Sequence, residues 1–172
     1  MKEKLVVIGN GMAGIRAVEE LLKLAPEKYD ITVFGAEPYP NYNRILLSPV
    51  LTGEKQFSEI VSNDDAWYTE HGIILHKGAK VVDIDRRNRR VITDRAMTAS
   101  YDRLLIATGS NPFVLPVPGK DLPGVIGFRD FADVETMLKA AHDYRHAVVI
   151  GGGLLGLEAA NGLMKQGMKV TV

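Results

Sequence analysis

The stretch VVIGNGMAGIRAVEELLK, residues 6–23, returns 142 residues later as VVIGGGLLGLEAANGLMK, residues 148–165. Nine of the 18 aligned positions are identical, which indicates a true internal repeat. Its period is much longer than the roughly 20–50 residues of solenoid and propeller repeats. The repeat therefore predicts two domains of one type.

Both copies show the same order of predicted elements. A Val/Ile-rich run (Leu5–Ile8, then Ala147–Ile150) is typical of a buried parallel strand. A glycine turn, a helix and a second strand (Ile31–Phe34, then Lys169–Val172) follow. This order predicts an α/β fold with two Rossmann-like dinucleotide-binding units. The helices are expected to bury the apolar residues Ile15, Val18, Leu21 and Leu22 in the first copy and Leu154, Leu155, Leu157, Ala159, Ala160 and Leu163 in the second.

The glycine turn has the pattern G-x-G-x-x-G in both copies. In such turns the first glycine permits the tight bend, the second lets a pyrophosphate approach the backbone, and the third allows close packing of helix on strand. The helix N-terminus then holds the anion. We therefore predict two dinucleotide sites, at Gly9, Gly11 and Gly14 and at Gly151, Gly153 and Gly156.

An acidic residue is expected about 20 residues after the turn, where it binds a ribose hydroxyl. Glu37 lies 23 residues after Gly14, just past the second strand, and fits this role. The matching position of the second copy would follow Val172. We therefore expect the second unit to be truncated. The residue that would distinguish NADH from NADPH is not in this sequence.

The composition narrows the class of protein. The chain has 172 residues, of which 46% are hydrophobic and 24% charged, as in globular proteins. Lys plus Arg and Asp plus Glu both number 21, a balance that disfavours nucleic-acid binding. The sequence has no cysteine, which excludes disulfides, Fe–S ligands and thiol chemistry within it. It shows neither a leader peptide nor a membrane span, so we expect a cytoplasmic protein.

Shorter elements are predicted between the repeats. Ser62 or Asn63 is expected to cap a helix over 64–70 whose Trp67 and Tyr68 serve packing, and strands are expected over 73–76, 80–85, 89–93 and 101–109. The tip at Arg86, Arg87 and Asn88 is interpreted as a solvated hairpin turn rather than a nucleic-acid contact.

Four prolines within residues 112–123 predict a stiff crossover before a helix over 131–141. We place the boundary there, with a domain over 1–114 and the start of a second over 115–172. The four histidines show no metal-ligand spacing, and no metal site is expected.

Three segments together resemble a known family: VVIGNGMAG at 6–14, YDRLLIATGSNP at 101–112 and VVIGGGLLGLEAA at 148–160. The chain resembles, over its whole length, the pyridine nucleotide-disulfide oxidoreductases, flavoprotein reductases with two dinucleotide sites. FGAEPYPNYNRILLSPVLTGE at 34–54 most resembles the N-terminal part of the large subunits of NAD(P)H-dependent nitrite reductases. Rubredoxin reductases and electron-transfer components of nitrate reductases are close neighbours.

The resemblance implies FAD at the first turn and NAD(P)H at the second. It assigns the FAD contacts to Gly9, Gly11, Met12, Ala13, Gly14, Glu37, Arg44, Val81, Ala107, Thr108, Gly109 and Arg129, and the NAD(P)H contacts to Gly151, Gly153, Leu154, Leu155 and Gly156. It also implies a catalytic position for Glu158, near the junction of flavin and nicotinamide. Pro49 stands where ferredoxin-reducing relatives often have lysine and thiol-using relatives have cysteine, so electrons are expected to leave the flavin for a metal centre or a partner protein.

The resemblance leaves three functions open. The first is the electron-input part of an enzyme reducing nitrite to ammonia, whose siroheme and Fe4S4 cluster would lie outside this sequence. The second is a free-standing reductase for rubredoxin or another carrier. The third is an inactive flavin-binding fragment that holds FAD poorly and associates. A redox partner, a small subunit and a homo-oligomer are compatible with all of them.

Overall fold

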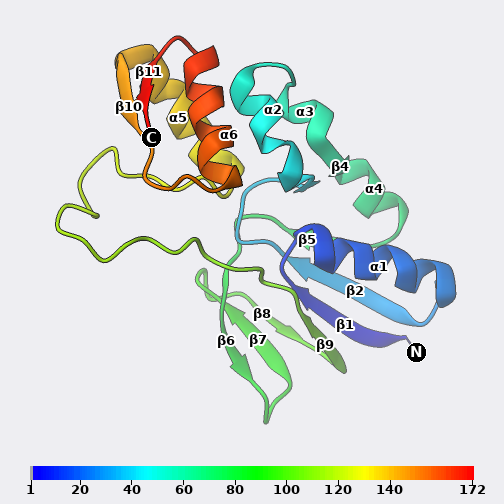
Figure 1. The fold of residues 1–172 in the computed structure, drawn as a ribbon. Coiled ribbons are helices and arrows are strands. Elements are labelled where there is room, and N and C mark those ends of the chain that lie inside the picture. The colour runs from blue at the N-terminus through cyan, green and yellow to red at the C-terminus, as the bar shows by residue number, and fades with distance from the viewer. Residues whose placement is uncertain (1) are drawn as a thin grey trace. The chain divides into compact units, whose positions relative to one another are not determined.

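The structure is a computed structural model that describes residues 2–172 (Figure 1). Its contacts divide the chain into two compact units. The N-terminal unit holds the chain up to Tyr42 together with Val61–Gly109. The C-terminal unit holds Asn43–Ile60 and Ser110–Val172, so each unit is built from two separate stretches of sequence.

A four-stranded parallel sheet forms the centre of the N-terminal unit. Its order is β5-β2-β1-β9. The strands are β1 (Glu3–Ile8), β2 (Tyr29–Phe34), β5 (Ile74–His76) and β9 (Arg103–Ile106). The sheet grows from β1 to one side through β2 and β5 and then to the other side with β9. The order in which strands are added therefore reverses between β1 and β9, although all four strands run parallel, and sheets of this kind bind ligands at such a switch point.

Alternation along β1 explains the layers on the two faces of this sheet. Leu5 and Val7 point toward α1 (Met12–Leu24) and α4 (Asp65–Glu70), in a cluster with Ile15 and Val18. Val6 and Ile8 point the other way, in a cluster that includes Val91. This second face is covered by an antiparallel sheet of β6 (Val81–Asp85), β7 (Arg90–Thr93) and β8 (Thr98–Ser100), which lies below the parallel sheet in Figure 1.

One local prediction, the N-cap of the helix over 64–70, needs correction, although the expected hairpin is present at Asp85–Arg90. Helix α4 is capped by Asp64, whose side chain accepts from the Trp67 N–H, and not by Ser62 or Asn63. Those two residues belong instead to β4 (Val61–Asn63), which pairs with β3 (Asn41–Tyr42). A carboxylate one residue nearer to the helix reaches the free N–H groups in better register.

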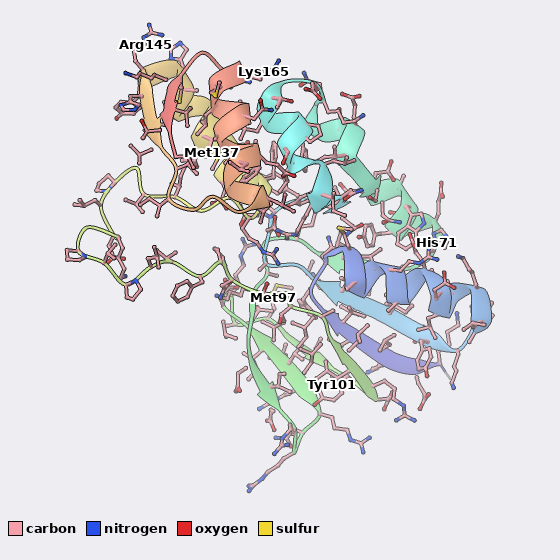
Figure 2. The ribbon with its side chains drawn as sticks, viewed as in Figure 1. His71, Met97, Tyr101, Met137, Arg145 and Lys165 are labelled. Atoms are coloured by element: carbon pink, nitrogen blue, oxygen red, sulfur yellow. The ribbon has the colours of Figure 1, made fainter. Side chains whose placement is uncertain are left out.

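The C-terminal unit contains the second copy of the repeat. Strands β10 (His146–Val148) and β11 (Lys169–Thr171) are parallel and flank α6 (Leu154–Lys165) in sequence. Helix α5 (Phe131–Asp143) precedes them, starts with a capping box at Asp130 and buries Met137, which is labelled in Figure 2. No helix or strand occurs among residues 107–130.

Three short elements from residues 43–60 join this unit, and the sequence did not predict them. They are the 3-10 helix η1 (Arg44–Leu46), α2 (Leu47–Thr52) and α3 (Phe57–Ile60). Helix α2 lies against α6. The two helices are so close that a Cβ built on Gly162 would come within 2.5 Å of Leu51 Cγ. Phe57 stacks on Phe131 with ring centroids 3.9 Å apart.

The predicted core face of the second helix is half wrong. Ala159, Ala160 and Leu163 are buried, but Leu154, Leu155 and Leu157 are exposed. Within residues 2–172, β10 pairs only with β11, so this sheet is too narrow to cover the first turn of α6. The helix buries its second half against α2 and α5 instead. No helix among the described residues is long and apolar enough to cross a membrane.

Candidate dinucleotide-binding site

The first glycine turn is packed tightly against the end of β9. Gly9 has φ +114°, and a Cβ on it would overlap the carbonyl oxygen of Ala107. A Cβ on Gly14 would lie 2.6 Å from the Gly9 carbonyl oxygen and 3.2 Å from the Ala107 Cβ. Glycine is required at both positions because this packing brings turn, helix and strand end together.

The middle glycine has a different environment. Gly11 has an extended backbone, with φ −91° and ψ 177°, and nothing lies within 4 Å of a Cβ built there. Neither strain nor crowding within the chain therefore requires glycine. A Cβ would fill only the space beside the N-terminus of α1, and in glycine turns of this pattern the equivalent space is where a pyrophosphate approaches the backbone.

The start of α1 has free hydrogen-bonding capacity. Gly11 is its N-cap, no side chain caps the helix, and its first turn carries no acidic residue. Met12 and Ala13, the first residues of the helix, are exposed. The N–H groups of this turn and the helix dipole thus favour an anion at this position.

Glu37 lies just past the end of β2, the neighbour of β1 in the sheet. Its Oε2 accepts a hydrogen bond of 2.6 Å from the buried Tyr42 hydroxyl, which fixes the direction of the carboxylate. Val81, the first residue of β6, packs in the cluster with Val6 and Ile8. Both residues therefore belong to the same unit as the first turn.

The Ala107-Thr108-Gly109 stretch continues β9 beside the first turn. The Ala107 N–H donates to the Ile8 carbonyl oxygen at 2.8 Å, and Gly109 has φ +73°. The structure thus brings this stretch together with Gly9 and Gly14, at the switch point between β1 and β9.

The second glycine turn repeats the backbone geometry of the first. Gly151 has φ +124°, and a Cβ on Gly156 would overlap the Gly151 carbonyl oxygen. Gly153 is the N-cap of α6 and has an extended backbone with nothing within 4 Å of a built Cβ. The first turn of α6 starts with Leu154 and Leu155, both exposed, and carries no acidic residue.

Three further predicted site residues belong to the C-terminal unit. Arg44 Nη1 donates to the Arg129 carbonyl oxygen at 3.2 Å, and the Arg129 guanidinium donates to Ser110 Oγ at 3.0 Å and to the Ser110 carbonyl oxygen at 3.1 Å. Glu158 Oε2 accepts a hydrogen bond from Ser48 Oγ in α2. Glu158 thus has a structural partner that the sequence did not reveal, and its catalytic role stays a prediction.

Sequence reasoning also missed Asn10, between the first two glycines. Its side-chain oxygen accepts a hydrogen bond of 2.7 Å from the Tyr68 hydroxyl, so Tyr68 does more than fill the core. An amide side chain inside a glycine turn was the available signal.

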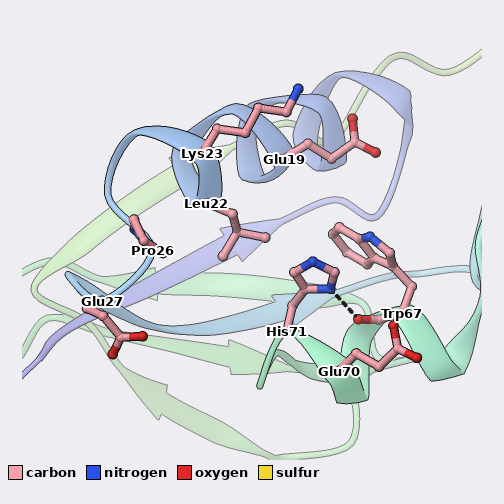
Figure 3. A pocket seen from close by; sticks show the side chains of 8 residues that line it. All are labelled: Glu19, Leu22, Lys23, Pro26, Glu27, Trp67, Glu70 and His71. Carbon is pink, nitrogen blue, oxygen red and sulfur yellow. Dashed lines mark hydrogen bonds between the residues drawn. The ribbon is translucent and has the colours of Figure 1, made fainter.

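A separate surface groove of about 600 Å³ lies between α1 and α4 (Figure 3). It is lined by Glu19, Leu22, Lys23, Pro26, Glu27, Trp67, Glu70 and His71. It contains none of the predicted site residues. No group of three or more potential metal ligands occurs among residues 2–172.

The chain is similar to known proteins over nearly its whole length. The family model described as pyridine nucleotide-disulphide oxidoreductase matches residues 3–172. The chain is 54% identical over 171 residues to the nitrite reductase [NAD(P)H] of Bacillus subtilis (strain 168), covering 99% of the chain and 21% of that protein. It is 53% identical to the assimilatory nitrate reductase electron transfer subunit of the same organism, covering 99% of the chain and 22% of that protein.

Among solved structures, the NADH:rubredoxin oxidoreductase of Clostridium acetobutylicum superposes with a TM-score of 0.86 at 27% identity. That match covers 99% of the chain and 44% of the solved protein. The chain thus spans about a fifth of the two Bacillus relatives and less than half of this solved reductase.

Proposed function

The chain belongs to the pyridine nucleotide-disulphide oxidoreductase family, and from this premise we propose that it is an electron-input module that binds FAD at its first glycine turn and NAD(P)H at its second. One observation carries the proposal. In both turns the first and third glycines are required by the fold, whereas Gly11 and Gly153 leave open space at a helix N-terminus. A bound pyrophosphate explains glycine at both positions.

The residues present fit FAD at the first turn. The N–H groups at the start of α1 would hold the pyrophosphate, and Glu37, oriented by Tyr42, would accept from a ribose hydroxyl. Ala107, Thr108 and Gly109 would line the cofactor at the end of β9, and Val81 would meet the adenine through its backbone. When bound, FAD and NAD(P)H supply the redox chemistry, and the protein supplies position and electrostatics.

Further roles proposed from the family resemblance fall on residues of the C-terminal unit. They include FAD binding by Arg44 and Arg129, which are joined to each other by one hydrogen bond. Glu158 would lie near the nicotinamide, with its carboxylate oriented by Ser48. The functional division at residues 114/115 remains our proposal, although Asn43–Ile60 pack with the C-terminal unit.

For the acceptor we propose a metal centre, with nitrite as the final substrate. This rests on the 54% identity to a nitrite reductase and on Pro49, which offers neither charge nor thiol. A free-standing reductase for a small carrier is the second candidate, and the match to the NADH:rubredoxin oxidoreductase favours it. Two assays separate these candidates. The first measures nitrite reduction by a chimaera that carries this chain in the Bacillus nitrite reductase, and the second measures reduction of rubredoxin.

The test of cofactor binding uses a matched pair of variants. We expect Gly11→Val to abolish binding of FAD while NADH binding stays, because the new side chain fills only the pyrophosphate space of the first turn. Gly153→Val should weaken NADH binding and leave FAD binding unchanged. Flavin fluorescence and isothermal titration calorimetry measure the two affinities.

Two results would contradict the proposal. Stoichiometric flavin in Gly11→Val would remove FAD from the first turn. A wild-type chain that binds neither cofactor and associates would support the inactive-fragment alternative.

A further inference from the structure

We propose that Tyr68 is a positioning residue that holds the first glycine turn in its binding geometry through Asn10. The proposal rests on the proposed function of that turn in binding FAD. Tyr68 lies on α4, well away from the turn in sequence, and none of the roles described for the site includes it.

Asn10 is fixed at both ends of its side chain. Its Oδ1 accepts from the Tyr68 hydroxyl at 2.7 Å, and its Nδ2 donates to the Tyr39 carbonyl oxygen at 3.3 Å. Its backbone carbonyl oxygen accepts from Asn41 Nδ2 at 3.1 Å. Two segments that are distant from the turn in sequence, residues 39–41 and α4, thus hold one residue of the turn.

The space for this arrangement is provided at the end of β2. A Cβ built on Gly35 would come within 2.9 Å of the Asn10 Cβ, so the absence of a side chain there lets Asn10 lie against the backbone. Gly35 is itself fixed by a hydrogen bond from its N–H to the His76 carbonyl oxygen at 2.9 Å. Asn10 therefore packs on backbone that is hydrogen-bonded to β5.

The Tyr68 hydroxyl has no other use in the core. Its ring packs with Val7, Ile15 and Ile73, and a phenylalanine ring would fill the same space. Tyr68 is 2% exposed, and burial raises the pKa of its phenol, which keeps the hydroxyl a neutral donor. The hydroxyl donates to Asn10 Oδ1. A buried hydroxyl needs such a partner, and the one found here belongs to the turn.

Rigidity matters in this turn because the proposed site holds the pyrophosphate mainly through backbone N–H groups. Their affinity depends on being oriented before the ligand arrives. The second turn has Gly152 in place of Asn10, with nothing within 4 Å of a built Cβ. Support of the turn by the Asn10 side chain is thus specific to the first turn.

The experiment compares Tyr68→Phe with wild type in the 172-residue chain. We expect affinity for FAD and for ADP to fall about 3- to 10-fold, the usual effect of one hydrogen bond. Adenosine, which lacks the pyrophosphate, should bind equally to both proteins. In the ligand-free chain, the NMR order parameter of the Gly11 N–H should fall from about 0.85 toward about 0.6.

Two further variants complete the design. Tyr101→Phe is the matched control, because Tyr101 (labelled in Figure 2) packs against the other core cluster of the same unit and should leave all readouts unchanged. In an Asn10→Ala background, Tyr68→Phe should have no further effect on ADP affinity, since the coupling runs through the Asn10 amide.

The outcomes separate this proposal from the one on which it rests. An unchanged Gly11 order parameter, an equal loss for adenosine and ADP, or a full effect in the Asn10→Ala background would overturn the role of Tyr68. Absence of FAD and ADP binding in the wild-type chain would instead overturn the proposed function. The order parameter still tests the hold on the turn in that case.

Discussion

The two copies of the repeat share their glycine geometry but differ in their surroundings. Val6 and Ile8 of the first strand are 1% and 5% exposed, whereas the identical residues Val148 and Ile150 of the second copy are 68% and 76% exposed. Strand β1 lies between two parallel neighbours, and β10 pairs with one. Local glycine spacing is thus enough to shape the turn, but burial depends on partners distant in sequence.

The helices differ in the same way. Helix α1 has one buried face and one charged face, on which Arg16, Glu20 and Lys23 form ion pairs. The position equivalent to Glu20 is Gly162, which is buried against Leu51. Helix α1 therefore keeps a solvated face, whereas the equivalent face of α6 packs on α2.

The largest contrast is expected at the first glycine of each turn. Gly9→Ala should lower the free energy of unfolding of the N-terminal unit by about 4 kcal/mol or more, because strain at positive φ adds to overlap with the Ala107 carbonyl. Gly151→Ala adds strain only and should cost about 1–3 kcal/mol in its own unit. Trp67, the single tryptophan, reports urea unfolding of the N-terminal unit. Equal shifts of the Trp67 transition in both variants would break the contrast.

A smaller contrast is expected between equivalent helix positions. Ile15 is 1% exposed and Leu157 is 52% exposed. Ile15→Ala should cost about 2–5 kcal/mol through the cavity it leaves, and Leu157→Ala should stay within about 0.5 kcal/mol. Trp67 fluorescence measures the first, and circular dichroism of the helices measures the second. A large loss for Leu157→Ala would show that its side chain is covered in solution.

The third contrast concerns the second face of each helix. Gly162→Ala should cost about 1–3 kcal/mol, since the added methyl meets the buried Leu51 at 2.5 Å. The equivalent Glu20→Ala removes only exposed ion pairs and should cost less than Gly162→Ala. Urea unfolding followed by circular dichroism compares them. A stabilised Gly162→Ala would mean that α2 moves aside without cost.

The smallest effect is a pH dependence confined to α1. A hydrogen bond from Lys23 and the nearby Arg16 charge lower the pKa of Glu20. A carboxylate whose pKa is lowered in the folded state stabilises it above the unfolded pKa, and this stabilisation is lost as pH falls through the folded pKa. The difference in urea midpoint between wild type and Glu20→Gln should therefore be present at pH 7 and vanish at acidic pH. A difference that persists at acidic pH would show that charge is not its cause.

Sequence analysis correctly predicted the features that are determined by residues close together in the sequence. The strands, glycine turns and helices of both copies were found because their signals lie within 30 residues of one another. The hairpin at Arg86–Arg89 was found for the same reason, even though Arg89 adopts φ +49°. The family followed from three such segments in order.

What the sequence did not predict depends on contacts between distant residues. The helices within 47–60 have little periodicity of their own and are stabilised by α5 and α6. The partner of Glu158 is Ser48, 110 residues away, and that of Asn10 is Tyr68, 58 residues away. Neither hydrogen bond can be predicted from the residues near it in sequence, so only the folded structure shows these pairs.

The interleaving of the two units also has a consequence for biosynthesis. Helix α2 starts at Leu47, but helix α5, which it contacts, starts at Phe131, 84 residues later. At about 5–20 residues per second, a ribosome needs about 4–17 s to make that stretch. During this time the apolar side of α2, with Leu47, Val50 and Leu51, has been made before its final partners exist. These apolar residues therefore stay available for premature association at least until α5 has been made.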